Sequence, residues 1–263
     1  MNTNLRIAAI PLDIVRFDKQ ANLINVERAL ASLPAGTDIA VLPELFSTGF
    51  VNDATLMADA AESNTGLTMQ TIASLAARYN LAIAGSFAAK TGHKIYNRGF
   101  FVEPSGDETF YDKHHLFCMS AEAKVFGHGG ECVRPVRFRG WNVALIVCYD
   151  LRFPAWCRNR GNSYDLLLVP ANWPSVRGYA WEHLLIARAI ENQAVVVGAN
   201  RGGSDDYGDY DGNSYIFDSN GRMVSYPLED SQIILADVSL DDIARNRQKL
   251  PVAQDADDFD IKC

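Results

Sequence analysis

Residues 141–156 read WNVALIVCYDLRFPAW, and this stretch predicts a buried strand with a candidate reactive residue at its end. Residues 143–147 are apolar at every position and rich in β-branched side chains, which is typical of a strand buried on both faces. Cys148 comes where that strand should end, and Pro154 stops regular structure soon afterwards. A strand end would fix the sulfur, and the turn would offer backbone N–H groups to an oxyanion. Cys148 is therefore a candidate nucleophile, with a small buried hydrophobe as the alternative.

The composition is that of a soluble globular protein. Of 263 residues, 48% are hydrophobic and 21% are charged, and we expect one domain over residues 1–263 with a C-terminal arm from about residue 252. The net charge of −8 argues against a general nucleic-acid or anionic-membrane surface. No signal peptide or membrane span is recognisable, and the five cysteines have no repeated short spacing. We therefore expect a cytoplasmic protein with reduced thiols that binds neither nucleic acid nor membrane.

The apolar periodicity predicts a mixed α/β protein, in which strands alternate with helices at first and hairpins intrude later. Strands are expected at residues 5–12, 38–42, 81–87, 95–102, 108–111, 133–138, 143–147, 165–170, 194–198 and 232–238, with a hairpin of 214–218 and 222–227. Helices are expected at residues 18–33, 68–79 and 181–192. Residues 47–65, 113–132 and 202–212 are predicted to be loops.

Three candidate catalytic residues, Glu44, Lys113 and Cys148, each come just after a predicted strand. In open α/β sheets, sites collect at the carboxyl ends of strands, so residues far apart in sequence can meet in one crevice. Taken singly, these residues also have simpler explanations, as a helix-start carboxylate, a surface charge and a core side chain. The combination of the three is therefore what indicates a site.

The contexts of these three residues resemble the nitrilase superfamily of carbon–nitrogen hydrolases. The family's catalytic glutamate lies in a Leu-Pro-Glu context, as in residues 41–44 (VLPE). Its lysine lies in a Tyr-Asp-Lys-x-His-Leu-Phe context, as in residues 111–117, and its cysteine in Cys-Tyr-Asp-Leu-Arg-Phe-Pro, as in residues 148–154. The three contexts occur in the family's order, and the resemblance extends from about residue 5 to about residue 252.

Three further stretches resemble the ω-amidase branch of this superfamily. They are residues 171–174 (ANWP), 187–193 (ARAIENQ) and 210–214 (YDGNS). One departure is visible, because relatives often carry histidine before the tryptophan that opens the next helix, where this chain has Ala180. That position lies outside the catalytic residues, so the departure concerns only the pocket or an interface.

The resemblance implies a four-layer α-β-β-α sandwich, a Glu–Lys–Cys triad, and a homodimer or higher homo-oligomer that stacks sandwich on sandwich. It implies that Glu44 takes the proton of Cys148, and that Cys148 attacks an amide carbonyl to form a thioester. Lys113 and the backbone N–H of Tyr149 would hold the oxyanion. Because lysine supplies the positive charge, we expect no metal or other cofactor. Glu122 falls where many relatives carry a second glutamate; we expect it to orient Lys113 and the substrate amide, with a solvated loop acid as the alternative.

Other polar residues near these motifs are expected to have structural roles. His114 and His115 could form a papain-type Cys–His dyad, but the resemblance places the base at Glu44. We therefore expect the two histidines to anchor their loop. Asp150 and Arg152 are expected to lock their turn as ion partners.

Two residues are expected to contact the substrate from the strand at 165–170. Trp173, just past that strand, is a predicted pocket wall. Arg177, four residues further on, is a candidate for binding a substrate carboxylate, with a surface arginine as the alternative. A local cation is needed for such a substrate because the protein as a whole is acidic.

The leading interpretation is an amidase that hydrolyses a small ω-amide, such as α-ketoglutaramate or α-ketosuccinamate, and releases ammonia. One alternative is another hydrolase of the same superfamily, such as a nitrilase or a carbamoyl hydrolase, which would share the triad and differ in the pocket. The second alternative is a binding protein on this fold that has lost activity. The intact triad argues against that alternative.

Overall fold

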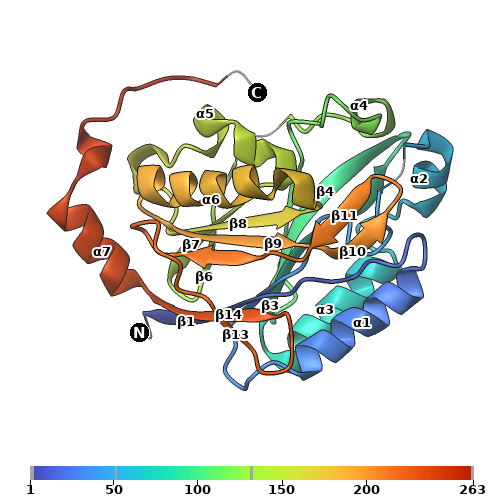
Figure 1. Ribbon diagram of the computed structural model, residues 1–263, viewed down its shortest axis with the longest axis horizontal. Coiled ribbons are helices and arrows are strands. Elements are labelled where there is room, and N and C mark those ends of the chain that lie inside the picture. Colours follow the sequence, from blue (N-terminus) through green and yellow to red (C-terminus); the bar gives the residue numbers. More distant parts are fainter. Residues whose placement is uncertain (1–2, 51, 131–132, 262–263) are drawn as a thin grey trace.

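Two β-sheets packed face to face form the centre of the molecule, and helices cover their outer faces (Figure 1). The computed structural model describes residues 3–50, 52–130 and 133–261. Helices α1 (Lys19–Ala31) and α3 (Leu67–Tyr79) cover one sheet, and helix α6 (Gly178–Asn192) covers the other. The four-layer α-β-β-α sandwich expected from the resemblance is therefore confirmed. No helix in these ranges is both long and apolar enough to cross a membrane.

The larger sheet has seven strands in the order β13-β14-β1-β2-β3-β4-β5. Strands β1, β2 and β3 are parallel, and the other neighbouring pairs are antiparallel. Because two antiparallel pairings separate β3 from β5, strands β2 and β5 end at the same edge of the sheet. The strand bounds are β1 (Asn4–Ala9), β2 (Ile39–Val41), β3 (Ala82–Thr91), β4 (Lys94–Val102), β5 (Glu108–Asp112), β13 (Tyr226–Pro227) and β14 (Ile234–Ser239).

The smaller sheet has five strands in the order β12-β9-β8-β7-β6, and its central strands β7, β8 and β9 are parallel. A separate hairpin, β10 and β11, follows β9. The strand bounds are β6 (Val136–Phe138), β7 (Trp141–Leu145), β8 (Leu166–Ala171), β9 (Val195–Asn200), β10 (Gly202–Asp205), β11 (Gly208–Asp211) and β12 (Tyr215–Phe217).

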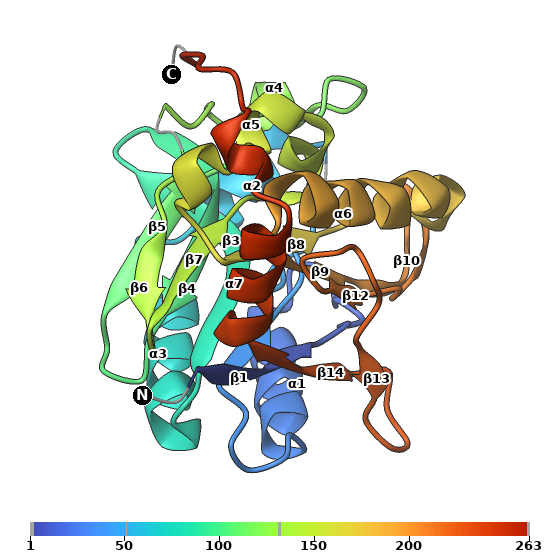
Figure 2. The ribbon, with the colours of Figure 1, turned by 90° about the vertical axis from the view of Figure 1, so that its left-hand side faces the viewer.

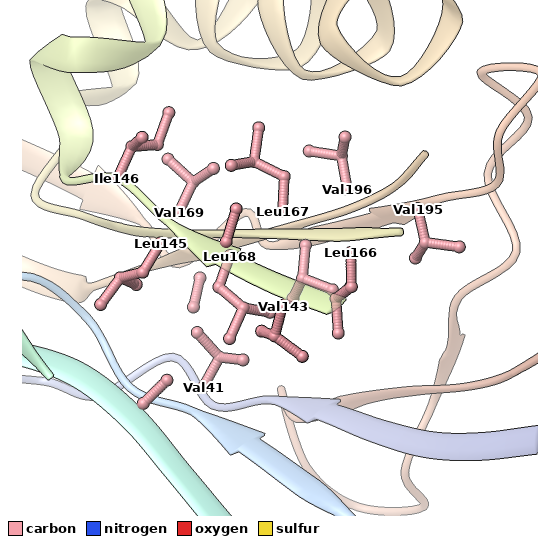
Figure 3. Packing of buried hydrophobic residues seen from close by; sticks show 14 of the residues in the cluster. Val41, Val143, Leu145, Ile146, Leu166, Leu167, Leu168, Val169, Val195 and Val196 are labelled. Atoms are coloured by element: carbon pink, nitrogen blue, oxygen red, sulfur yellow. The ribbon is translucent and has the colours of Figure 1, made fainter. Parts of the chain in front are cut away.

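Alternate side chains of the smaller sheet pack into two different layers. Figure 3 shows Leu145 and Leu168 pointing toward the larger sheet, while Ile146 and Leu167 point toward the helical layer. All four are buried, and each fully buried Leu or Ile contributes roughly 1.5–3 kcal/mol to folding. Both faces of this sheet are thus removed from water, which explains why residues 143–147 are apolar at every position.

The outer helices form because one face of each is apolar. In α1, Leu23, Val26 and Leu30 are buried at helical spacing, and the Asp18 side chain caps the helix by accepting from the backbone N–H of Ala21. The remaining helices are α2 (Ala54–Ala60), α4 (Glu122–Val125), α5 (Pro154–Cys157) and α7 (Leu240–Lys249), with 3₁₀ turns η1 (Cys148–Arg152), η2 (Arg160–Asn162), η3 (Ser175–Arg177) and η4 (Val252–Gln254).

The prediction of a loop over residues 47–65 is wrong, because this segment contains α2. Met57 is the one buried residue of that helix, so no apolar periodicity marks it. Its start is stabilised by Asp53, whose side chain accepts hydrogen bonds from the backbone N–H groups of Thr55 and Leu56. A helix that depends on a cap and one anchored side chain leaves little trace in a hydrophobic pattern.

The prediction of a loop over residues 202–212 is also wrong, because β10 and β11 form a hairpin there. Its sequence is rich in Gly and Asp and lacks apolar alternation. Fully buried Arg201 precedes it and pairs with Asp205, with 2.7 Å between Nη1 and Oδ2. A polar interaction therefore fixes this hairpin, which pattern reasoning based on apolar residues does not detect.

The chain end and two strand boundaries also differ from expectation. Strand β7 ends at Leu145, and Cys148 begins the turn η1. The expected hairpin of 214–218 and 222–227 is confirmed next to its turn, where Phe217 and Met223 form an antiparallel bridge, but its second arm then leaves: β13 pairs with β14 in the larger sheet, while β12 belongs to the smaller one. Helix α7 was not expected from the sequence. It runs along the side of the sandwich, and the chain then continues toward α5 (Figures 1 and 2).

The contact between α6 and β9 makes a first prediction. A Cβ on Gly198 would lie 2.5 Å from Leu185 Cδ1 and 2.6 Å from Trp181 Cζ2, so Gly198→Ala should lower the free energy of unfolding by about 1–3 kcal/mol. Urea denaturation measures this quantity. Gly178→Ala is the control, because its new Cβ meets no atom within 4 Å. Its free energy of unfolding should be at most about 0.5 kcal/mol below that of the original protein, or higher. Equal stability of the two variants would contradict the packing described.

Candidate active site

A pocket of about 290 Å³ lies where the chain leaves strands β2, β5, β7 and β8. It is lined by every site residue expected from the sequence: Glu44, Lys113, Glu122, Cys148, Tyr149, Trp173 and Arg177. Glu44 follows β2 and Lys113 follows β5, both from the larger sheet. Cys148 and Trp173 follow β7 and β8 of the smaller sheet. The pocket therefore combines residues of both sheets.

Lys113 lies between two buried carboxylates. Its Nζ is 2.8 Å from Glu44 Oε1 and 2.6 Å from Glu122 Oε1, and all three residues are at most 5% exposed. Burial by itself would lower the pKa of Lys113, but the charges of Glu122 and Glu44 outweigh it and raise that pKa well above 10.5. The lysine is therefore a permanent cation at this position.

Asn97 on β4 joins the two carboxylates from the other side. Its Nδ2 donates to Glu44 Oε1 at 2.7 Å and to Glu122 Oε1 at 3.3 Å. Its Oδ1 accepts from Ser86 Oγ at 2.9 Å, and this hydroxyl in turn accepts from the backbone N–H of Leu45. Sequence reasoning missed Asn97 and Ser86, because uncharged residues inside apolar strands carry no distinguishing pattern.

The peptide of Asn172 connects Glu44 with Cys148. Its N–H donates to Glu44 Oε2 at 2.9 Å, and its carbonyl oxygen lies 4.0 Å from Cys148 Sγ. Burial and the nearby charge of Glu44 raise the pKa of Cys148 well above 9.0, although Lys113 acts in the opposite direction. The resting sulfur is therefore a thiol, and its nucleophilic form requires a base within reach.

The turn η1 holds Cys148 in an unusual backbone conformation. The φ angle of Cys148 is +45°, in the left-handed region that non-glycine residues rarely occupy. The first backbone bond of the turn runs from the N–H of Asp150 to the carbonyl of Val147. The N–H groups of Cys148 and Tyr149 precede that bond, so they have no acceptor within the turn.

Asp150 holds this turn against the loop that carries Lys113. It is fully buried, and its Oδ2 accepts from Tyr111 Oη at 2.7 Å and from the N–H of Val147 at 3.2 Å. Its Oδ1 lies 2.8 Å from both the backbone N and the Nδ1 of His115. One carboxylate therefore fixes the position of the Cys148 turn relative to Lys113.

The two histidines after Lys113 pack away from the pocket and bind the surrounding loop. His114 Nδ1 is 2.7 Å from the carbonyl oxygen of Gly129, and its ring stacks on Trp156 at 3.8 Å. The ring of His115 stacks on Phe153 at 3.6 Å. This geometry fits the expected anchoring role and offers no Cys–His pair.

The expectation that Arg152 pairs with Asp150 is wrong, since Asp150 is occupied by Tyr111 and His115. The Arg152 guanidinium instead lies 4.7 Å from the ring centroid of Trp173 and lines the pocket. Arg177 lies on the same wall, 5.2 Å from the ring centroid of Phe117. The wall beyond the cysteine therefore carries two arginines on aromatic supports.

The pocket mouth joins segments that are distant in sequence. Tyr207, at the tip of the β10–β11 hairpin, accepts a hydrogen bond at Oη from the backbone N–H of Asn52. Asn52 Oδ1 accepts from the backbone N–H of Ala121, next to Glu122. The hairpin is thus linked to the segment that positions the second glutamate.

The described residues contain no group of three or more His, Cys, Asp or Glu side chains that could hold a metal ion. The positive charge that faces Cys148 and Glu44 is supplied by Lys113. The chemistry available in this pocket is therefore that of a thiol, two carboxylates, an ammonium group and backbone N–H groups.

Comparisons with known proteins agree with this geometry. The carbon–nitrogen hydrolase family model matches residues 6–248. The omega-amidase YafV of Escherichia coli strain K12 is 40% identical over 257 residues, which is 97% of this chain and 98% of that protein. The 2-oxoglutaramate amidase of Bacillus subtilis strain 168 is 30% identical and covers 95% of this chain and 96% of its own length.

The fold comparison gives the same result. The crystal structure of a CN-hydrolase superfamily protein from Xanthomonas campestris, which carries an arsenic adduct in its active site, has a TM-score of 0.92 and 36% sequence identity, and covers 98% of this chain and 99% of its own. The family expected from the three sequence contexts is confirmed, and the chain belongs to the carbon–nitrogen hydrolase family.

Proposed function

We propose that this protein hydrolyses the C–N bond of a small ω-amide through a thioester on Cys148, releasing ammonia. The observation that carries the proposal is the position of the Asn172 peptide, whose N–H donates to Glu44 Oε2 and whose carbonyl oxygen lies near Cys148 Sγ. Lys113 binds the other oxygen of Glu44. A thiol with a raised pKa, a carboxylate and a permanent cation together supply a nucleophile, a base and an oxyanion partner.

The geometry suggests which oxygen of Glu44 acts as the base. Oε1 already accepts hydrogen bonds from the side chains of Lys113 and Asn97, whereas Oε2 accepts from the backbone N–H of Asn172, the residue whose carbonyl oxygen lies near Cys148 Sγ. We therefore propose that Oε2 takes the Cys148 proton as the sulfur attacks the amide carbonyl. Lys113 Nζ and the N–H of Tyr149 stabilise the oxyanion.

The tetrahedral intermediate then collapses with cleavage of the C–N bond. Glu44 returns its proton to the departing nitrogen, and ammonia leaves a thioester on Cys148. Glu44 next takes a proton from water, which attacks the thioester carbonyl. Collapse of the second intermediate releases the carboxylic acid, and the proton returns to the thiol. Glu122 holds Lys113 in place and faces the substrate amide during both halves.

Two observations support a substrate with a remote carboxylate. Relatives at 40% and 30% identity are an omega-amidase and a 2-oxoglutaramate amidase. In this chain the pocket is small and carries Arg177 on the wall beyond Cys148. We therefore propose that short α-keto dicarboxylate monoamides, such as α-ketoglutaramate and α-ketosuccinamate, are substrates. The homodimer implied by the resemblance and the cytoplasmic location expected from the composition stay predictions; two exposed apolar side chains of α6, Tyr179 and Ile190, fit the former.

The nucleophile can be tested by substitution and by trapping. Cys148→Ala should abolish ammonia release while circular dichroism and thermal unfolding stay unchanged, because the variant loses one sulfur atom. Rapid quenching of the original protein with substrate should give an acyl adduct on Cys148 in mass spectra. Cys118→Ala, which removes an exposed thiol, is the control and should retain activity. Turnover by Cys148→Ala would rule out the proposed thioester.

The charged cluster makes a separate prediction. Glu44→Gln and Lys113→Met should each lower kcat by at least about 100-fold, because they remove the base and an oxyanion donor. Glu122→Ala should reduce activity while the acyl adduct on Cys148 still forms. Lys124→Met, at an exposed lysine of α4, is the matched control. Undiminished kcat in Lys113→Met would remove the oxyanion role of this lysine.

The substrate class can be tested by ammonia release from ω-amides, α-amides, carbamoyl compounds and nitriles. The highest kcat/KM should belong to an ω-amide that carries a carboxylate. Arg177→Ala should raise KM for that substrate more than for a neutral amide of the same length, because only the former has an anion to bind. Faster hydrolysis of nitriles or neutral amides by the original protein would overturn the ω-amide proposal and leave the nucleophile untouched.

A further inference from the structure

Arg152 is a cation at the pocket without an assigned role. It is the last residue of η1, the turn that begins with Cys148. No carboxylate in the described part of the chain forms an ion pair with Arg152 or with Arg177; both guanidinium groups lie over aromatic rings. An aromatic face orients an arginine without neutralising it, so both groups remain available to an anion.

The other charges at the pocket are already paired. The charged residues in the pocket wall are three carboxylates and three cations: Glu44, Glu122 and Asp205, with Lys113, Arg152 and Arg177. Lys113 is shared by the two glutamates, and Arg201 pairs with Asp205. Among the described residues, every lining charge except those of Arg152 and Arg177 therefore has an ion-pair partner.

Trp173 connects the two arginines. Its ring supports the Arg152 guanidinium, and its Nε1 donates to the carbonyl oxygen of Arg177 at 2.9 Å. The backbone of Trp173 is held in turn by Asn200, whose Oδ1 accepts from its N–H and whose Nδ2 donates to its carbonyl oxygen. Both arginines are thus held by Trp173, a buried residue whose own backbone is fixed by Asn200, as a preorganised subsite requires.

We propose that Arg152 is a specificity-determining residue, and that it forms with Arg177 an anion subsite for the remote carboxylate of a linear ω-amide. This inference rests on the proposed function and adds a residue and a selection rule to it. A substrate carboxylate supplies the anionic partner that these two arginines lack among the described residues. An α-ammonium group beside that carboxylate is repelled by the same two arginines, so α-oxo and unsubstituted acids are preferred over α-amino acids such as glutamine.

The position of Arg152 also sets the length of the substrate. Cys148, which attacks the amide, and Arg152, which holds the carboxylate, are the first and last residues of one 3₁₀ turn. Asp150 fixes the centre of this turn through its bonds to Tyr111 and His115. The backbone spacing of the two residues is therefore fixed, and the ring of Trp173 orients the guanidinium, so kcat/KM should peak at one chain length within a series of dicarboxylate monoamides.

The test compares glutaramate, the monoamide of glutarate, with pentanamide, a neutral amide with the same number of carbons. Arg152→Met should raise KM for glutaramate about 10- to 100-fold, the usual effect of losing a charged hydrogen bond, and should change pentanamide hydrolysis by less than about 3-fold. Arg152→Lys should recover part of the loss. Arg160→Met is the matched control, because that arginine also lies over an aromatic ring, Phe259, but outside the pocket.

A binding experiment separates this inference from the proposed function. Glutarate, the product of glutaramate hydrolysis, should bind the Cys148→Ala protein in calorimetry, though more weakly than glutaramate does, and Arg152→Met in that background should weaken glutarate binding about 10-fold or more. Equal losses for glutaramate and pentanamide, or unchanged glutarate binding, would overturn the role of Arg152. Failure of the original protein to release ammonia from any amide would instead overturn the proposed function, whatever the binding of glutarate.

Discussion

The arrangement of the pocket depends on one buried cation, Lys113, held between Glu44 and Glu122. Bringing three charges out of water is costly, and the cost is met only when each has a partner and its remaining hydrogen bonds are satisfied. Asn97 and the backbone N–H groups of Asn172 and Phe117 complete that set. Asn97 lies on a strand of the larger sheet, Phe117 in the loop after Lys113, and Asn172 just past a strand of the smaller sheet. The ion cluster can therefore form only when the two sheets have packed together.

A third buried carboxylate, Asp150, fixes the turn of Cys148 relative to this ion cluster. The left-handed backbone at Cys148 stores strain of the order of 1–3 kcal/mol, which persists only where the surroundings over-determine it. Asp150 supplies the constraint by binding the turn at Val147 and the lysine loop at His115. Cys148 and Lys113 are thus fixed relative to each other through a residue that does not line the pocket.

Much of this site could be predicted from the sequence, because Glu44, Lys113 and Cys148 lie in distinctive contexts just past strands with clear apolar signals. Sequence reasoning missed Asn97 and assigned Asp150 the wrong partner for one physical reason. Both residues bind partners that are distant in sequence, about 50 positions away for Asn97 and about 40 for Asp150, and such pairing leaves no local pattern. Arg152 was misassigned for the same reason, because its neighbour in sequence was already bound elsewhere. Helix α2 and the β10–β11 hairpin were missed because caps and polar pairs stabilise them more than apolar periodicity does.

The distribution of charge within the pocket favours one orientation of a bound substrate. Lys113 is shared by two carboxylates, Glu44 and Glu122, whereas Arg152 and Arg177 form no ion pair with any described residue. A neutral amide group suits the first end and a carboxylate suits the second, so a monoamide of a dicarboxylic acid enters in one orientation. Hydrolysis converts the amide into a second carboxylate, which then faces Glu44 and Glu122. Like charges in a buried site repel strongly, so the reaction that the proposed function requires also weakens the binding of its own product.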